Sequence, residues 1–295
     1  MAAEVLHLNF DDAWPGEIDL PTRDLREWGP RLRFSAPARE IESFDLSLGE
    51  NLPPFLVFGS GDFHHLSALF IRRRQQRLTN VVSFDNHPDW DIRPPRWGCG
   101  SWVNRALELP AIEKVSVWGC GNFECWWPAR IFGNNRAERA GRLEVHPWAD
   151  NRSTNDRARR GAILREDWRE QFQLFVRQLQ SVSVYVTIDL DCLRAEESAT
   201  NWENGCFSLG DLVWAVESLG KNAHIVAGDI CGAWSRAVYA RHKQRFASQM
   251  DHPKLPARDP AQMRAANLAA LRALLPALTD RNENDAEADH DRADR

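Results

Sequence analysis

Acidic and histidine side chains gather in the segment VVSFDNHPDWD, residues 81–91, directly after a run of apolar residues. Asp85 and His87 are two positions apart, so in an extended chain both side chains point the same way, about 6.6 Å apart. Pro88 bends the chain and lets Asp89 turn back toward the same point. Carboxylates and an imidazole that meet at the end of a buried strand would repel one another or stay unsatisfied without a cation. The segment therefore predicts a metal site.

A second apolar run, VYVTIDLDCL at residues 184–193, also ends in acids at alternate positions, Asp189 and Asp191. One such pair is compatible with a helix cap or a surface turn. Two strands of one sheet that each end in alternating acids are harder to explain in that way. The carboxyl ends of strands in an open parallel sheet form the active-site crevice, so we expect both acidic segments at that edge.

A third segment, FGSGDFHHLS at residues 58–67, places two histidines between a short apolar run and a helix-like segment. Its Gly-Ser-Gly turn permits a tight connection from strand to helix. A lone histidine is usually a surface or capped residue. A pair at the same edge as two acidic segments is better interpreted as the source of one more metal ligand, from either His64 or His65.

Together the three segments offer four aspartates and two histidines for metal binding. The predicted ligands are His64, Asp85, His87, Asp89, Asp189 and Asp191. Mixed oxygen and imidazole ligands favour manganese, with iron, zinc, cobalt and nickel as alternatives. Six ligands are too many for one catalytic ion with an open position, and they suit two ions about 3.5–4 Å apart. We therefore predict two Mn²⁺ ions as the cofactor.

The elements that must position these residues follow from hydrophobic periodicity. We predict strands at residues 5–10, 31–34, 55–58, 81–84, 114–118, 142–145, 182–188 and 223–227. Apolar residues at intervals of three and four predict helices at residues 66–77, 102–109, 165–179, 209–219 and 260–278. Alternating strands and helices imply an α/β protein with a mostly parallel sheet covered on both faces.

Two polar stretches and an excess of tryptophan stand apart from this alternation. Residues 124–139 predict a loop over the site, and residues 147–161 predict a surface loop. Several of the 13 tryptophans lie in or near the polar segments, namely Trp90, Trp97, Trp102, Trp126, Trp127 and Trp202. Core packing and an aromatic-walled pocket explain them equally well.

Length and composition bound the class of protein. The 295 residues suit one large domain, which we expect over residues 1–279. Residues 280–295 contain almost no apolar side chains and predict a disordered acidic tail. The net charge of −5 argues against nucleic acid as the main partner.

The segments that could direct the chain to a membrane are missing from the sequence. The first residues, MAAEVLHLNFDD, do not resemble a secretory signal, and no stretch approaches the roughly 20 apolar residues that span a bilayer. The six cysteines are scattered without paired zinc spacing. We expect a cytoplasmic protein that acts on a small-molecule or peptide substrate, with no membrane partner and with homo-oligomerisation left open.

The polar segments resemble motifs of the arginase/agmatinase ureohydrolases. DNHPD at residues 85–89 is similar to their Asp-Ala-His-x-Asp motif, and TIDLD at residues 187–191 to their Ser-x-Asp-x-Asp motif. GDFHH at residues 61–65 is similar to the Gly-Gly-Asp-His segment that supplies the first metal histidine. VAGD at residues 226–229 resembles the late strand that ends in Gly-x-Asp. The motifs follow the family order along the chain.

The resemblance implies an arginase/deacetylase-like fold, a three-layer α/β/α sandwich with an eight-stranded, mostly parallel sheet. It implies one ion held by His64, Asp85, Asp89 and an oxygen on the Asp191 side, and another held by Asp85, His87, Asp189 and Asp191. His65 stays open in place of His64, because this chain has an extra residue between Asp62 and the histidines. Asp89 is the expected catalytic residue, which holds the attacking water and passes a proton to the departing nitrogen.

Several features of the family pattern are missing here, including the residue that pairs with the substrate. Ureohydrolases carry a glutamate that pairs with the substrate guanidinium three residues after the late-strand aspartate, and Gly232 stands at that position. Residues 93–102 lack the family's loop histidine, and residues 194–205 lack its Asp-Pro and Gly-Gly segments. A guanidinium would lose a charge-assisted pair unless Glu203 or Glu124 supplies the anion, and each of these is more simply interpreted as a surface loop acid.

Three functions are compatible with these residues. The first is hydrolysis of a guanidino group, including that of arginine within a peptide or of a modified guanidino compound. The second is metal-dependent deacetylation or amide hydrolysis of an acylated amine, but such enzymes usually keep a single zinc and fewer ligands. The third is a non-catalytic metal-binding scaffold, which the presence of every ligand disfavours. The sequence therefore favours a dinuclear hydrolase of a carbon–nitrogen bond.

Overall fold

An eight-stranded sheet forms the centre of the computed structural model, which describes residues 4–14, 16 and 18–280. The strand order is β2-β1-β3-β8-β7-β4-β5-β6, and all neighbouring strands are parallel. The predicted tail lies outside the described residues, apart from Asp280. Among the described residues, no helix has the length and apolar character needed to cross a membrane.

The elements have the following bounds. The strands are β1 Val5–Asn9, β2 Thr22–Asp24, β3 Phe55–Phe58, β4 Asn80–Phe84, β5 Lys114–Cys120, β6 Leu143–Pro147, β7 Ser183–Asp189 and β8 His224–Cys231. The α-helices are α1 Gly29–Leu32, α2 Ala38–Ser47, α3 Leu66–Arg74, α4 Trp102–Leu107, α5 Asn135–Arg139, α6 Thr154–Arg157, α7 Trp168–Gln178, α8 Leu209–Gly220, α9 His242–Asp251 and α10 Pro260–Thr279. Short 3₁₀ helices lie at Gly61–Phe63, Gln75–Arg77, Cys99–Ser101, Phe123–Cys125, Ala129–Phe132 and Leu190–Cys192.

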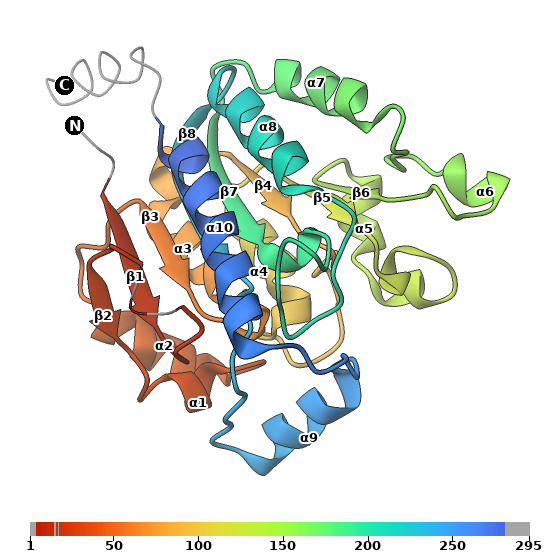
Figure 1. Ribbon diagram of the computed structural model, residues 1–295. Helices are drawn as coiled ribbons and strands as arrows, with labels where there is room; N and C mark the ends of the chain where they lie inside the picture. The colour runs from red at the N-terminus through yellow and green to blue at the C-terminus, as the bar shows by residue number, and fades with distance from the viewer. Residues whose placement is uncertain (1–3, 15, 17, 281–295) are drawn as a thin grey trace, which may run out of the picture.

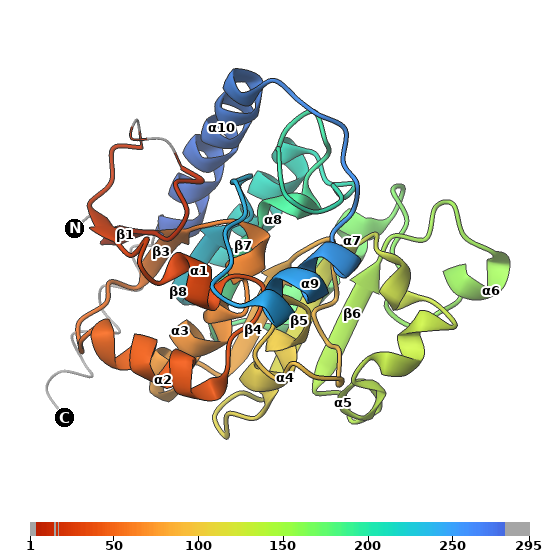
Figure 2. The same cartoon turned by 90° about the horizontal axis from the view of Figure 1, so that it is seen from below.

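Helices cover both faces of the sheet, as the two views show (Figures 1 and 2). Side chains of a strand alternate between its two faces, so Phe55 and Val57 of β3 pack into the layer of α7, α8 and α10. Leu56 and Phe58 pack into the opposite layer, with α2, α3 and α4. The predicted three-layer α/β/α sandwich is confirmed, and its sheet is parallel throughout.

Most predicted elements are confirmed, but residues 31–34 do not form a strand. Gly29–Leu32 is the short helix α1, since the fixed φ of Pro30 suits a first helical turn. Arg33 is then buried against acidic partners, and Phe34 has a φ of 66° that no strand accommodates. The eighth strand is β2 instead. It is a three-residue polar edge strand with exposed outer side chains, so no apolar pattern marked it.

The predicted loops and two helices also differ from the expectation. The stretch 124–139 is partly ordered into 3₁₀ turns and α5, and the stretch 147–161 contains α6. Helices α2 and α9 were not predicted, because α9 in particular is mostly polar and exposed. The expected start of α8 is confirmed. Ser208 Oγ accepts from the Asp211 amide at 3.1 Å, and the Asp211 carboxylate accepts from the Ser208 amide at 3.1 Å.

Candidate metal centre

The register between β4 and β7 brings two acidic residues to the same point. Phe84 pairs with Ile188, so Asp85 and Asp189 follow side by side where the two strands end. Side-chain alternation places both aspartates on the face that α3 covers. The central expectation from the sequence, that both acidic segments lie at one edge of one sheet, is confirmed.

His64 supplies the first cluster of ligand atoms, between the 3₁₀ turn at Gly61–Phe63 and α3. Its Nδ1 lies 3.1 Å from Asp85 Oδ2, 3.3 Å from Asp89 Oδ2 and 3.5 Å from Asp189 Oδ2. Although the first of these distances is short, the two atoms do not meet in hydrogen-bond geometry, and neither has a hydrogen-bond partner among the described residues. The atoms instead surround a common point, as ligands of a cation do.

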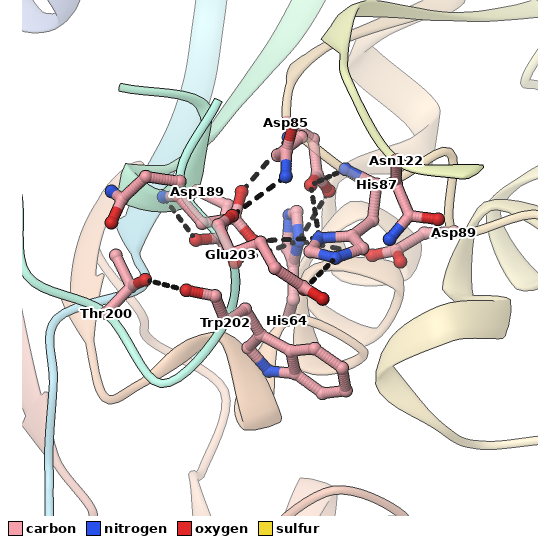
Figure 3. A network of polar contacts seen from close by, with 12 residues as sticks. His64, Asp85, His87, Asp89, Asn122, Asp189, Thr200, Trp202 and Glu203 are labelled. Atoms are coloured by element: carbon pink, nitrogen blue, oxygen red, sulfur yellow. Dashed lines mark hydrogen bonds and ion pairs between the residues drawn. The ribbon is translucent and has the colours of Figure 1, made fainter. Parts of the chain in front are cut away.

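His87 supplies the second cluster. Its Nδ1 lies 2.8 Å from Asp191 Oδ2 and 3.7 Å from Asp85 Oδ1. In each cluster the potential ligand atoms lie within 4.8 Å of one another, and Asp85 belongs to both. Figure 3 shows the histidines and aspartates pointing toward one centre from separate segments.

The structure thus brings together all six residues that the sequence singled out, and it resolves two details. His64 rather than His65 faces the acids, since the described residues place His65 in none of the clusters that could hold a metal. Burial lowers the pKa of His65 to about 3, as expected of a neutral core histidine. The fourth side chain beside His64 is Asp189 and not Asp191, because Asp191 sits one short turn further along, against His87.

The electrostatics of the centre call for positive charge. The six side chains are nearly inaccessible, from 1% exposed for Asp85 to 9% for His87. Burial raises the pKa of Asp189 and of Asp191, since a buried carboxylate loses its hydration. Burial lowers the pKa of His64, but the facing carboxylates outweigh that effect and raise it well above its ordinary value. Divalent cations would satisfy these oxygens and nitrogens, so the residues present fit a metal pair.

A chain of hydrogen bonds behind His64 sets its orientation. Thr187 Oγ1 donates to Asp229 Oδ1 at 2.6 Å, so its oxygen is left to accept from His64 Nε2 at 2.9 Å. Tyr185 Oη donates to the other Asp229 oxygen at 2.5 Å. With the proton on Nε2, Nδ1 presents a free lone pair to the acids, which is the tautomer that a metal ligand needs.

Asp89 is positioned by its backbone and by an indole. Its φ of 46° turns the chain back after Pro88, as the sequence predicted. Trp102, fully buried at the start of α4, donates from Nε1 to Asp89 Oδ2 at 2.6 Å. Trp90, Trp102 and Trp126 pack in the core, as one explanation of the tryptophans expected, and Trp202 lines the cavity, as the other expected.

A cavity opens above the candidate ligands. Its other lining residues are Gly61, Cys99, Gly100, Asn122, Phe123, Glu124, Trp202, Glu203 and Asp251. Glu203 is half exposed and lies 3.5 Å from His87 Nε2, measured from Oε2. Glu124 and Asp251 have no ion-pair partner within the described ranges. Burial raises the pKa of both carboxyls and so does the charge of Asp91, while the nearby His87 and Arg93 oppose that rise.

Asp251 escaped the sequence analysis. It ends α9, where the sequence suggests an ordinary exposed helix acid. Helix α9 reaches the site because His252, the next residue, places Nε2 2.6 Å from Asp62 Oδ1, and its ring packs edge-on against Trp202. Gln244 of α9 also donates to the backbone oxygen of Arg33, so contacts between distant segments bring Asp251 to the cavity.

Comparisons with known proteins bear on the fold of the chain. No family model matches the chain. An uncharacterized protein of Thermotoga maritima is 29% identical over 175 residues, which cover 59% of this chain and 55% of that protein, so the chain spans about half of its relative's length.

Solved structures extend the comparison to nearly the whole chain. Proclavaminate amidino hydrolase of Streptomyces clavuligerus is 13% identical with a TM-score of 0.55, covering 94% of this chain and 93% of that one. Arginase from Medicago truncatula is 15% identical with a TM-score of 0.51, and formimidoylglutamase of Bacillus subtilis is 14% identical with a TM-score of 0.51. Each of these two covers 93% of this chain, across 87% of its own length.

The chain has the ureohydrolase fold. At these low identities the likeness concerns the fold alone. One of the departures from the resemblance lies directly after β8.

Gly232, at the end of β8, leaves no space for any side chain. Its φ is +101°, and a Cβ atom would lie 2.1 Å from Asp189 Oδ1 and 2.5 Å from the Leu190 amide nitrogen. The glutamate that the resemblance implies at this position could not fit this backbone. The backbone of β8 presses directly on Asp189, so the ureohydrolase fold here requires glycine at this position.

Proposed function

We propose that this protein is a dinuclear metal-dependent hydrolase of a carbon–nitrogen bond in a guanidino or related amidino group. The observation that carries the proposal is the pair of buried clusters that share Asp85, one around His64 and one around His87. Two divalent ions with a shared carboxylate form the arrangement that activates a water molecule for hydrolysis. Manganese is the metal we propose first, with iron, zinc, cobalt and nickel as alternatives.

The chain's own side chains would orient the reaction around this centre. His64, Asp85, Asp89 and Asp189 would hold one ion, and Asp85, His87, Asp189 and Asp191 the other. The hydrogen bond from Trp102 fixes one oxygen of Asp89. Burial and the neighbouring Asp85 raise the pKa of Asp89, which suits a carboxyl that takes a proton and passes it to the departing nitrogen. We assign this proton transfer to Asp89.

The open side of the cavity would hold the substrate. Glu124 and Asp251 present carboxylates to the cavity, and in the described part of the chain neither forms an ion pair within 4 Å, although Arg93 and His87 lie near enough to act on both charges. A guanidinium or amidinium supplies the charge and the parallel N–H donors that carboxylates bind best. Glu203, beside His87, is a third acid within reach. These acids support a positively charged substrate, either a small guanidino compound or an arginine side chain in a peptide.

The test combines metal analysis with a substrate screen. Protein purified without chelator should contain about two divalent ions per chain if both clusters are filled. The manganese-loaded protein is then screened for urea or ammonia release from guanidino compounds and arginine peptides, and for acetate release from acylated polyamines. Acetate release alone would replace the proposal with deacetylation, and absence of bound metal would overturn it.

A matched variant separates the enzyme from a contaminant. Asp191→Asn should lose the activity found in the screen, whereas Asp91→Asn should keep it. Asp91 belongs to the same polar segment as the ligands, but its carboxylate pairs with Arg93 at 2.5 Å. Metal binding without release of any product from the full panel would favour a metal-binding scaffold.

A further inference from the structure

A cysteine stands at the metal centre in addition to the expected ligands. Cys231, the last residue of β8, pairs in register with Asp189 of β7. Neighbouring strands place paired side chains on the same face, and Cys231 Sγ lies 3.6 Å from Asp189 Oδ2. The thiol is fully buried, so it has no contact with solvent.

The distances around the thiol suit a bound ion. One ligand atom each from Cys231, His64 and Asp189 lie within 4.8 Å of one another. Zinc-like ions bind sulfur at about 2.3 Å and nitrogen or oxygen at about 2.0–2.2 Å, so opposite ligands stand up to about 4.5 Å apart. Independently of the thiol, His64 Nδ1 is buried without a hydrogen-bond partner among the described residues and faces the same point.

We propose that Cys231, as a thiolate, is an additional ligand of the ion on the His64 side. The inference deepens the proposed function, on which it rests, because it concerns one of the two proposed ions. On binding, the S–H bond breaks, the proton leaves to solvent, and the sulfur electron pair forms the bond to the metal. No oxidant or reductant takes part.

A thiolate changes which metal this position selects. Carboxylate and water ligands suit manganese, whereas thiolates select softer ions such as zinc, cobalt and iron. The His87 side offers only nitrogen and oxygen donors. The two positions should therefore differ, with the softer ion bound beside Cys231 and manganese accepted more readily beside His87.

The test is a spectrum of the metal-free full chain reloaded with Co²⁺. A thiolate ligand adds a charge-transfer band in the near ultraviolet to the visible bands that any bound Co²⁺ shows. We expect this band in the unmodified protein and its loss in Cys231→Ser, with the visible bands kept. Cys99→Ser is the matched control, since Cys99 is also a buried thiol that lines the cavity, and it should keep the band.

The remaining outcomes tell whether the role of Cys231 fails alone or the proposed function fails with it. Visible bands without the charge-transfer band, or a band that Cys99→Ser removes, would overturn the role of Cys231 and leave the metal-dependent function standing. No visible bands at all would overturn both. Competition between Zn²⁺ and Mn²⁺ gives a second measurement, in which Cys231→Ala should weaken the preference for zinc by about 10-fold or more. An unchanged preference would contradict the inference.

Discussion

The ends of β4 and β7 and the end of β8 lie side by side on one edge of the sheet but hold different chemistry. Asp85 directly follows β4 and Asp189 ends β7, and their carboxylates face a common point. Gly232 directly follows β8, and its backbone presses on Asp189 so that no side chain fits there. The ends of β4 and β7 thus carry candidate metal ligands, whereas the end of β8 has no space for a side chain.

This contrast shows that the candidate metal ligands and the acids at the open side of the cavity come from different segments. The metal site needs several atoms around one point, so its residue types at β4 and β7 cannot change independently. An anion that binds a substrate cation can come from any segment that reaches the cavity. Glu124 follows β5 and Asp251 ends α9, so these cavity acids, which we propose bind the substrate, come from segments other than β8.

The largest effect is expected when a candidate metal ligand is replaced. Asp89→Asn or Asp191→Asn should lower the turnover rate by at least about 100-fold, since even residues behind a metal ligand commonly matter about 10–100-fold. Turnover and metal content per chain are the measurements, with Asp91→Asn as the control. Full activity in either variant would remove these strand ends from the catalytic site.

The next effect tests whether the end of β8 is truly closed. Gly232→Ala should destabilise the protein by about 2–5 kcal/mol, since positive φ costs about 1–2 kcal/mol and overpacking about 1–3 kcal/mol. Urea unfolding at a fixed metal concentration measures the change. Gly210→Ala is the control, because a Cβ there meets nothing within 4 Å in α8, and it should be neutral or slightly stabilising. Equal stability of both variants would show that the position is open.

A smaller effect should follow from neutralising the substrate side. Glu124→Gln and Asp251→Asn should each raise KM for a guanidino substrate about 10-fold, the size of one lost charge-assisted pair, and change kcat less. Glu108→Gln, whose carboxylate pairs with Arg96 on the surface, is the control. If KM stays constant in both variants, the acids at the cavity do not bind the substrate.

The dependence of KM on pH tests the same role of Glu124 and Asp251. Only the ionised carboxylates bind a cation, and burial raises the pKa of Glu124 and of Asp251. As pH falls, these groups are protonated earlier than carboxyls of ordinary pKa, so KM should rise at a higher pH than an unshifted acid would cause. In the double variant Glu124→Gln with Asp251→Asn, this rise should be absent.

The smallest effect is expected at Glu203. Its carboxylate lies 3.5 Å from His87 Nε2 but is 49% exposed, so solvent screens the contact. Glu203→Gln should change KM or kcat only a few-fold, as exposed ion pairs contribute about 0–1 kcal/mol. Steady-state kinetics at low and high salt measure it, and a loss as large as that of Asp191→Asn would move Glu203 to the metal side of the comparison.

Local patterns in the sequence were enough for much of the fold. Buried inner strands such as β3 and β4 are continuous apolar runs, and α8 carries its own capping residues, so neighbouring residues alone identify them. β2 and α9 could not be predicted, because a polar edge strand and a mostly exposed helix carry little apolar periodicity. The strand predicted at residues 31–34 was wrong, because this segment buries Arg33 against Asp62 and does not pair with the sheet.

The sequence by itself determined the metal side of the site. Alternation along a strand is a local property, so Asp85, His87, Asp189 and Asp191 were identifiable from spacing alone. Tertiary structure decided what depends on distant segments meeting. It selected His64 over His65 through the hydrogen bond of His64 to Thr187. The crossing of β8 beside β7 brought Cys231 to Asp189 and closed Gly232, because those contacts depend on strand order and register, which no local pattern encodes.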